Sequence, residues 1–265
     1  MQARQSAGLC VSFKIATWNV NSLRVRLPLL LAFLELHQPD VVALQETKVE
    51  DHHFPLQVLQ AAGYHCLFSG QKTYNGVALL SRTPLQLIRT ALPSGLDPQC
   101  RLLSAYLHPV KIINLYAPNG ASPDSDKYQY KLQWFEALHH YIQSALNHYP
   151  KLIVLGDFNI APEDRDVHDP EAWVGQVLVS EAERTAFQRL LKLGLHDTFR
   201  IIHPNTIQYT WWDYRQGAFR RNRGLRIDHV LCSTALAAEA IGCDIETHWR
   251  QIERPSDHAP VMAYF

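Results

Sequence analysis

Polar side chains stand at the ends of several apolar, strand-like runs in this sequence. Glu46 follows DVVALQ, Tyr116 ends KIINLY, and Asp157 and Asn159 follow LIVLG, while Asp228 lies within GLRIDHVL. Carboxylates are rarely buried unless they are paired or bind a metal ion. One such residue could be a turn or cap residue. Several of them at strand ends together indicate a shared site.

The C-terminal segment ERPSDHAPV raises a further question, because chain ends fray unless something holds them. Its Asp257 and His258 lie between two prolines, and the apolar run 261–265 follows them. This pattern indicates a tail built into the fold that delivers a catalytic pair. Near the other end of the chain, Asn19 and Asn21 close the strand-like KIATW in the same way.

The side chains of this set suit a hard cation. Glu46, Asp257 and the two asparagines offer oxygen ligands, which Mg²⁺ or Mn²⁺ prefer and a zinc site does not. The sequence contains fourteen histidines but no HExxH or similar spacing. The adjacent pairs His52-His53 and His139-His140 are interpreted as solvated surface residues.

Asp228 and His258 could form a carboxylate–imidazole pair, in which the carboxylate fixes the tautomer of the ring. No Gly-x-Ser-x-Gly motif accompanies them, so the attacking group would be water. Water, a hard metal ion and an imidazole together favour hydrolysis of a phosphoester. The metal ion, His258 as imidazolium, the asparagine amides and the Tyr116 hydroxyl could offset the phosphate charge.

Composition limits the class of protein. A hydrophobic fraction of 47% in 265 residues allows a well-buried core, and the formal net charge of zero means that nucleic-acid affinity must come from local basic clusters. The five cysteines show no CxxC spacing, which is typical of a reduced cytosolic chain. We interpret residues 1–12 as a disordered leader, neither signal peptide nor membrane span, so a secreted or membrane-bound enzyme is not expected.

Short β-branched runs alternate with helical patterns along the rest of the chain. Eight strands are expected, at 13–18, 40–44, 77–81, 102–107, 112–116, 152–155, 227–231 and 261–265. Helices are expected at 26–36, 128–148 and 181–193. KIATWNVNS and KLIVLGDFNIAP echo each other, one in each half of the chain. The repeat predicts two similar halves with one sheet each, packed as an α/β sandwich with helices outside.

Eight motifs in order give the sequence a resemblance to the exonuclease III class of abasic-site DNA-repair endonucleases, within the DNase I-like endonuclease/exonuclease/phosphatase superfamily. The motifs are WNVNSLR, LQETK, GQKTYNGVALLSR, NLYAPNG, LGDFNIAP, YTWWDYR, NRGLRIDHVL and PSDHAPV. The resemblance covers about residues 13–265. It implies one domain with a four-layer α/β sandwich of two mixed sheets flanked by helices.

The resemblance also implies roles on the metal side of the site. Glu46 matches the main metal ligand, with Asn21 and Asp257 nearby, and Asn19 matches an amide that organises the site. The implied ion is Mg²⁺ or Mn²⁺.

On the phosphate side, the resemblance implies that Asp157 activates or orients the attacking water and that Asn159 positions it and contacts the oxyanion. Tyr116 matches the hydroxyl that meets the scissile phosphate. His258, held by Asp228, matches a second contact to phosphate or water. Whether Asp157 or His258 takes the proton stays open.

Substrate contacts follow from the same resemblance. An apolar pocket against the base-free sugar would be formed by Trp211, Trp212, Leu225 and Ile227, although the two tryptophans could instead be core residues. Arginines that could contact the DNA backbone are Arg101, Arg215, Arg220, Arg221, Arg223 and Arg226. Weaker candidates for such contacts are Lys72, Tyr74, Asn75, Lys127 and Lys131. A solvated basic loop is the alternative for the segment 213–226.

The bulky stretch DVHDPEAW could control which substrate enters. His168 and Trp173 in it are candidate wedges that would block an extrahelical sugar within an unbroken strand yet admit a 3′ terminus. The sequence leaves open whether abasic incision or 3′-end trimming dominates.

The residue patterns indicate a metal-dependent phosphoesterase, and the resemblance implies a DNA-repair phosphodiesterase. It would act as abasic-site (AP) endonuclease, 3′–5′ exonuclease or 3′-phosphatase on double-stranded DNA with abasic sites or blocked 3′ ends. A monomer in a bacterial-type cytoplasm, with the nucleoid, is expected. One alternative is a phosphoinositide or sphingomyelin-type phosphatase on the same scaffold, which the Arg/Trp loop disfavours. The other is a DNA-binding relative without catalysis.

Overall fold

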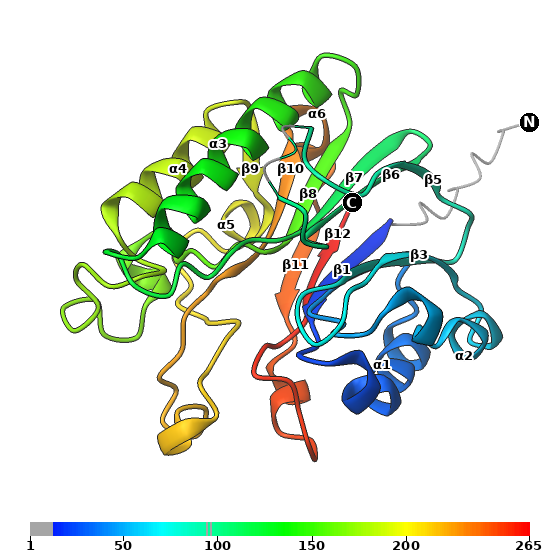
Figure 1. Cartoon of the computed structure of the whole chain (residues 1–265), viewed down its shortest axis with the longest axis horizontal. Coiled ribbons are helices and arrows are strands. Elements are labelled where there is room, and N and C mark those ends of the chain that lie inside the picture. Colours follow the sequence, from blue (N-terminus) through cyan, green and yellow to red (C-terminus); the bar gives the residue numbers. More distant parts are fainter. Residues whose placement is uncertain (1–12, 94, 96) are drawn as a thin grey trace, which may run out of the picture.

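The computed structural model describes residues 13–93, 95 and 97–265. The predicted leader at residues 1–12 lies outside them. Two six-stranded mixed sheets pack face to face, and helices cover the outer face of each (Figure 1). This is the predicted four-layer α/β sandwich.

The first sheet has the strand order β11-β12-β1-β2-β4-β3, and only β1 and β2 run parallel. Its outer face is covered by α1 (Leu23–His37) and α2 (Leu56–Ala61), where apolar side chains of α1 bury against alternate residues of β1, β2 and β4. The strands are β1 (Lys14–Asn19), β2 (Val41–Gln45), β3 (His65–Ser69), β4 (Val77–Ser81), β11 (Gly242–Ile245) and β12 (Val261–Tyr264).

The second sheet has the order β5-β6-β7-β8-β10-β9, with β7 and β8 parallel. Its outer face is covered by α3 (Asp126–Leu146) and α4 (Glu181–Leu191). Each of these helices is capped by the serine that precedes it, whose hydroxyl accepts a backbone N–H of the first turn: Ser125 for α3 and Ser180 for α4. The strands are β5 (Gln86–Arg89), β6 (Leu102–Leu107), β7 (Val110–Tyr116), β8 (Leu152–Asp157), β9 (Leu195–Asp197) and β10 (Asp228–Ser233).

Short helices line the connecting segments. They are η1 (Asp51–His53), η2 (Asp164–Asp166), α5 (Thr198–Ile202), η3 (Arg215–Gly217), α6 (Thr234–Ala237) and η4 (Thr247–Arg250). The loop around η3 projects from one end of the sandwich, next to the segment that carries η4 (Figure 1). No helix in the described part of the chain is long and apolar enough to cross a bilayer.

The predicted division of the two sheets between the halves of the chain needs correction. Strands β11 and β12 belong to the second half, yet they lie in the first sheet, where β12 pairs with β1 and β11 pairs with β12. This return fixes the C-terminal tail next to the N-terminal strand, as the ERPSDHAPV pattern required. It also brings residues 256–258 to the same end of the sandwich as the exits of β1 and β8.

Candidate active site

The exits of β1 and β8 meet across the two sheets at one amide group. Asn19 donates through its Nδ2 to Glu46 Oε1 at 2.8 Å and to Asp157 Oδ2 at 2.9 Å. Asn19 is fully buried and Asp157 is 1% exposed. A buried amide that donates to two carboxylates holds both at short range, which is the organising position that the sequence predicted for Asn19.

The backbone around Asp157 is set by its neighbours. Gly156 has φ +142°, and a Cβ there would lie 1.9 Å from the carbonyl oxygen of Leu115 on β7, so only glycine allows the close approach of these strands. Beyond the strand, Asn159 has φ +52° and its backbone N–H donates to Asp157 Oδ1 at 2.9 Å. Both oxygens of Asp157 are therefore held in place by buried donors.

A second chain of contacts runs from Asp228 through His258 to Asp157. Asp228 Oδ2 lies 2.8 Å from His258 Nδ1, and His258 Nε2 lies 3.8 Å from Asp157 Oδ2. Asp228 and Asp157 are also direct partners in the pairing of β10 with β8. Both carboxylates and the ring are buried, so their charges interact strongly.

The tail that carries His258 is held by hydrogen bonds from several elements. The Ser256 hydroxyl donates to the Asn19 carbonyl at 2.6 Å, and the Trp18 indole N–H donates to the His258 carbonyl at 3.2 Å. The backbone N–H of Ala259 donates to Thr210 O at 2.7 Å. The residues 256–259 are thus fixed from both sides before the chain enters β12.

Burial and neighbouring charges shift the pKa values of Asp157 and His258. Burial raises the pKa of Asp157, and the charge of Asp228 raises it further, to about 7. Burial alone would lower the pKa of His258, but the charges of Asp228 and Asp157 outweigh it and raise the value to about 10. At neutral pH the site therefore holds an imidazolium beside a carboxylate that can accept a proton.

Glu46, Asp157 and His258 surround a common position, since one oxygen or nitrogen atom from each lies within 4.8 Å of the others. Three buried or half-buried carboxylates, from Glu46, Asp157 and Asp228, crowd here, and one oxygen of Asp228 accepts no hydrogen bond among the described residues. Such an excess of negative charge fits a divalent cation. The carboxylate oxygens around this position are the donor type that hard cations prefer.

The other two predicted metal ligands form an adjacent hydrogen-bond network. Asn21 Nδ2 donates to Asp257 Oδ1 at 2.9 Å, and Asn21 Oδ1 accepts from Lys48 Nζ at 2.5 Å. Asp257 Oδ2 accepts from the Trp211 indole at 3.0 Å. Burial alone would raise the pKa of Asp257, but the His258 charge and these hydrogen bonds lower it. Asp257 is not one of the three residues grouped around the common position.

Tyr116 ends β7 beside the acidic group. Burial raises the pKa of its hydroxyl well above 10, and the charges of Glu46 and Asp157 add to this, so the hydroxyl is a proton donor at any working pH. The Arg101 guanidinium lies 4.9 Å from the centroid of the Tyr116 ring and donates to the Tyr116 carbonyl at 3.3 Å. Arg101, predicted as a DNA contact, thus also supports Tyr116.

The predicted sugar-binding residues separate into two groups. Trp211 packs with Leu225, Ile227 and Trp173 in a small apolar group, which we call the Trp211 cluster. Leu225 and Ile227 are buried, so Trp211 and Trp173 are the members of this set that offer surface. Trp212 is a correction: it is 2% exposed in the core between the sheets, because neighbouring residues of an extended segment point to opposite sides.

The predicted backbone contacts separate in the same way. Arg215, Arg220, Arg221 and Arg223 are all exposed on the projecting loop around η3. Two further candidates need correction because they are buried in ion pairs. Arg226 contacts Asp166 and Asp197 at 2.7 Å each, and Lys131 contacts Glu183 at 2.5 Å. Lys72, Tyr74 and Lys127 are exposed, whereas Asn75 is buried.

Of the two proposed wedge residues, Trp173 belongs to the Trp211 cluster and His168 packs on Trp173. The backbone N–H of His168 donates to Gly224 O at 3.1 Å, and its ring Nδ1 lies 3.2 Å from the same oxygen. The His168 and Trp173 rings meet edge to face with centroids 6.3 Å apart. Both side chains are partly exposed. His168 therefore borders the cluster through its contact with Trp173.

Sequence reasoning gave no role in the catalytic site to three residues that shape it, although Lys131 was named as a DNA contact. Lys48 lies 2.8 Å from Glu46 Oε2 and also binds Asn21. Asn119 donates to Asn159 Oδ1 at 3.4 Å, and Lys131 donates to the Asn159 carbonyl at 2.6 Å. Lys48 and Asn119 stand within the motifs LQETK and NLYAPNG, so their positions carried a signal. Lys131 lies in no such motif, and its position in the sequence is typical of an exposed lysine on a helix.

The fold and this site agree with known proteins. Residues 16–258 match the Endonuclease/Exonuclease/phosphatase family. Exodeoxyribonuclease III of Haemophilus influenzae is 37% identical over 95% of this chain and 99% of its own length. A Neisseria 3′ phosphatase, solved with a product DNA hairpin, is 48% identical with a TM-score of 0.94, covering 96% of this chain and 99% of that one. An Archaeoglobus fulgidus AP endonuclease is 42% identical with a TM-score of 0.93, covering 96% and 99%.

The chain therefore belongs to the endonuclease/exonuclease/phosphatase family, whose members have the DNase I-like fold and depend on a metal ion. Within that family it is a DNA-repair phosphodiesterase with nuclease activity, of the exodeoxyribonuclease III type.

Proposed function

We propose that this enzyme chiefly trims blocked 3′ ends of double-stranded DNA, releasing 3′-phosphate and removing terminal nucleotides, and that incision at abasic sites is its slower activity. The observation that carries the proposal is the His168 side chain beside the Trp211 cluster, packed edge to face on Trp173. An extrahelical sugar in an unbroken strand has to pass this ring, whereas a 3′ terminus can approach from the side. The 48% identity with a Neisseria 3′ phosphatase supports release of 3′-phosphate as an activity of this enzyme.

Glu46 would hold Mg²⁺ or Mn²⁺, with Asn21 and Asp257 beside it, and Asp157 would face the attacking water. When bound, the ion supplies positive charge to the phosphate oxygens and to the leaving 3′ oxygen. Asp157 accepts the proton of the attacking water, because its pKa of about 7 suits a general base at neutral pH. His258 stays imidazolium, since its pKa is raised to about 10, and donates to a non-bridging oxygen together with the Tyr116 hydroxyl.

The duplex would be held by the exposed arginines of the loop around η3, namely Arg215, Arg220, Arg221 and Arg223. Tyr214 anchors this loop, since its hydroxyl donates to the Pro255 carbonyl at 2.9 Å and accepts from Arg26 at 2.8 Å. DNA contacts on the loop therefore connect directly to the segment that precedes Asp257. We further propose a monomer that acts in the cytoplasm with the nucleoid, where this substrate lies; light scattering should give the mass of one chain.

Abasic incision is the second candidate for the main activity, because the Trp211 cluster offers an apolar surface suited to a sugar without a base and an AP endonuclease is 42% identical. Comparing initial rates on a 3′-phosphate duplex and an abasic duplex decides between them.

The wedge is tested by His168→Gly, with His53→Gly as the matched control because His53 is exposed on η1, away from this cluster. His168→Gly should raise abasic incision relative to 3′-phosphate release by about tenfold or more, an effect of about 1.4 kcal/mol on the barrier. His53→Gly should leave the ratio unchanged. An unchanged ratio in His168→Gly would refute the role of His168 as a wedge. Abasic incision that is faster than 3′ trimming in the unmodified enzyme would overturn the proposed order of activities.

A further inference from the structure

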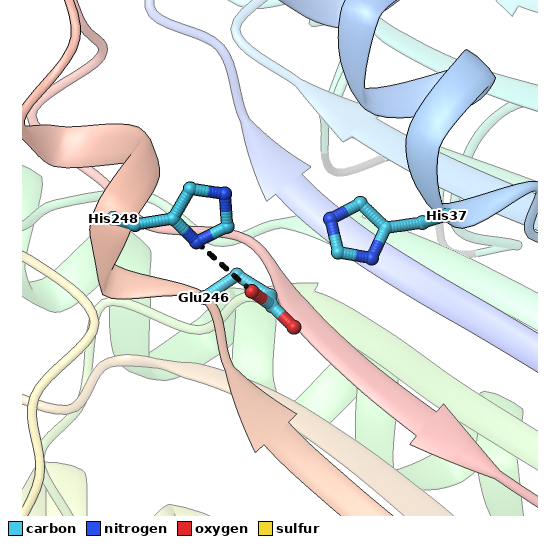
Figure 2. A group of neighbouring side chains, drawn as sticks. All are labelled: His37, Glu246 and His248. Atoms are coloured by element: carbon cyan, nitrogen blue, oxygen red, sulfur yellow. Dashed lines mark ion pairs between the residues drawn. The ribbon is translucent and has the colours of Figure 1, made fainter.

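A second cluster of potential metal ligands lies apart from the catalytic residues, between α1 and η4. His37 is the last residue of α1, Glu246 directly precedes η4, and His248 lies within η4. Figure 2 shows the two imidazole rings facing each other with the Glu246 carboxylate beneath them. One potential ligand atom of each residue lies within 4.8 Å of the others. Nothing in the catalytic mechanism uses these three side chains.

The backbone that carries the three side chains is already ordered. The α1 helix closes at Gln38, whose N–H donates to Leu34 O at 3.0 Å. The Glu246 N–H donates to Pro260 O at 2.9 Å, and the Trp249 N–H donates to Glu246 O at 3.2 Å. Side-chain rotations alone can therefore complete a coordination sphere. The cost in chain entropy is then small.

The spacing within the cluster suits a tetrahedral ion. His248 Nδ1 lies 3.1 Å from Glu246 Oε2. Two ligands on a tetrahedral zinc ion lie about 3.3 Å apart when each bond is about 2.0–2.1 Å long. The His37 and His248 ring centroids are 6.2 Å apart, which leaves room for an ion between the rings. Two imidazoles and one carboxylate form a ligand set that zinc-class transition metals accept, with a fourth position for water.

The local electrostatics favour a cation at this place. His37 stands at the C-terminal end of a 15-residue helix, where the helix dipole attracts positive charge. Among the described residues, Glu246 has no ion pair with a lysine or arginine, and its one ion-pair partner is His248. An incoming metal ion therefore displaces no lysine or arginine from Glu246, and at His37 Nε2 it replaces a long hydrogen bond of 3.4 Å from the Trp249 indole N–H.

Two other histidine clusters on the surface lack these features. Glu136 with His139 and His140 is one, but Glu136 already holds the Arg189 guanidinium, so a metal ion would have to displace it. The second is formed by Glu50, His52 and His53, which lie next to one another in sequence at η1, and both of its histidines are exposed. The cluster between α1 and η4 joins elements more than 200 positions apart in the sequence, and its His37 is half-buried between Phe33 and Trp249.

We propose that His37, Glu246 and His248 form a peripheral site for a zinc-class divalent transition metal, distinct from the catalytic centre. The bound ion ties the end of α1 to η4. From η4, the Arg250 guanidinium reaches Ser256 O at 2.5 Å and Trp212 O at 3.4 Å. Metal at this site therefore stabilises the segment 246–257 that leads to Asp257 and His258, and its role is structural.

The test measures Zn²⁺ and Co²⁺ binding to the full-length, chelator-treated enzyme in millimolar Mg²⁺, which saturates oxygen-ligand sites but competes poorly for imidazoles. One equivalent of Zn²⁺ should bind by calorimetry. Co²⁺ should give the visible absorption of a low-coordinate site and quench the fluorescence of the adjacent Trp249. His37→Asn and His248→Asn should each raise the dissociation constant of this one Zn²⁺ ion at least tenfold.

The matched controls are His53→Asn and His140→Asn, which disable the two competing clusters. Both controls should still bind one equivalent of Zn²⁺. Zn²⁺ at about 100 times its dissociation constant should raise the thermal midpoint by about 5–10 °C, and this shift should vanish in His248→Asn. His248 is exposed, so that variant folds even if the half-buried His37 position does not tolerate asparagine. Absence of Mg²⁺-resistant Zn²⁺ binding, or its retention in His248→Asn, would overturn the site. Neither readout depends on nuclease activity.

Discussion

The hydrogen bond between Asp228 and His258 gives the sharpest prediction, because one substitution removes a charge without changing shape. In Asp228→Asn, the amide replaces a carboxylate that lies 2.8 Å from His258 Nδ1. Charges about 4 Å apart interact by about 4 kcal/mol at an effective dielectric constant of about 20, which is about 10³-fold in an equilibrium. We expect kcat for 3′-phosphate release to fall by about 10²–10⁴-fold. KM should stay within about threefold, because DNA contacts lie elsewhere.

The pH profile distinguishes this account from simple damage to the fold. The Asp228 charge raises the pKa of both His258 and Asp157. Without it, His258 loses its proton at lower pH and Asp157 gains its proton only at lower pH. Both limbs of the kcat profile should therefore move to lower pH.

The assay is single-turnover cleavage of a 3′-phosphate duplex between about pH 5 and 10, the range that spans both shifted groups. Asp244→Asn, an exposed acidic position on β11, is the control and should behave like the unmodified enzyme. Circular dichroism should verify that both variants are folded. A kcat within threefold of the unmodified value, or a reduced kcat with unmoved limbs, would refute the role assigned to Asp228.

Two further predictions concern stability. Burial lowers the pKa of His229, and the charge of Arg226 lowers it further, to about 4. Between pH 6.5 and 4 the unfolded chain therefore binds a proton at His229 that the folded protein does not bind. The free energy of unfolding should fall by about 3 kcal/mol as the pH drops through that window. Urea unfolding of His229→Gln should lack this part of the acid sensitivity, and equal slopes for both proteins would contradict it. Gly156→Ala should destabilise the protein by more than about 3 kcal/mol, because its Cβ would clash with Leu115 O at 1.9 Å. Gly63 also has a positive φ, +89° against +142° at Gly156, but open space surrounds its Cβ position, so Gly63→Ala should cost about 1 kcal/mol. Similar losses in both variants would exclude the clash as the cause.

The sequence predicted the central strands of both sheets and missed the edges. The eight predicted strands correspond to β1, β2, β4, β6, β7, β8, β10 and β12. The four that were missed, β3, β5, β9 and β11, are the two edges of each sheet. An edge strand has one neighbour and a mixed surface, as in β5 with three exposed residues of four, so it lacks the apolar run that marks a buried strand.

Helix cores were predicted better than helix ends. The helix expected at 26–36 spans Leu23–His37, and the one expected at 181–193 ends at Leu191. Helix ends depend on capping contacts that apolar spacing does not report.

The side chains of the candidate site could be predicted from motifs, but the network that joins them could not. Asn19 was expected to organise the site, yet its bridge between Glu46 and Asp157 depends on how two sheets meet. Trp211 and Trp212 are neighbours with opposite environments, which composition cannot separate.

The central claim is that Glu46, Asp157 and His258 act as one metal-dependent centre on a phosphodiester. The most direct test is single-turnover cleavage of a 3′-blocked duplex with and without Mg²⁺, for the unmodified enzyme and for Glu46→Gln, Asp157→Asn and the double variant. We predict no cleavage without a divalent ion, a loss of about 10³-fold or more in each single variant with DNA binding retained, and little further loss in the double variant. Cleavage that persists without metal, or losses that multiply in the double variant, would contradict a shared centre.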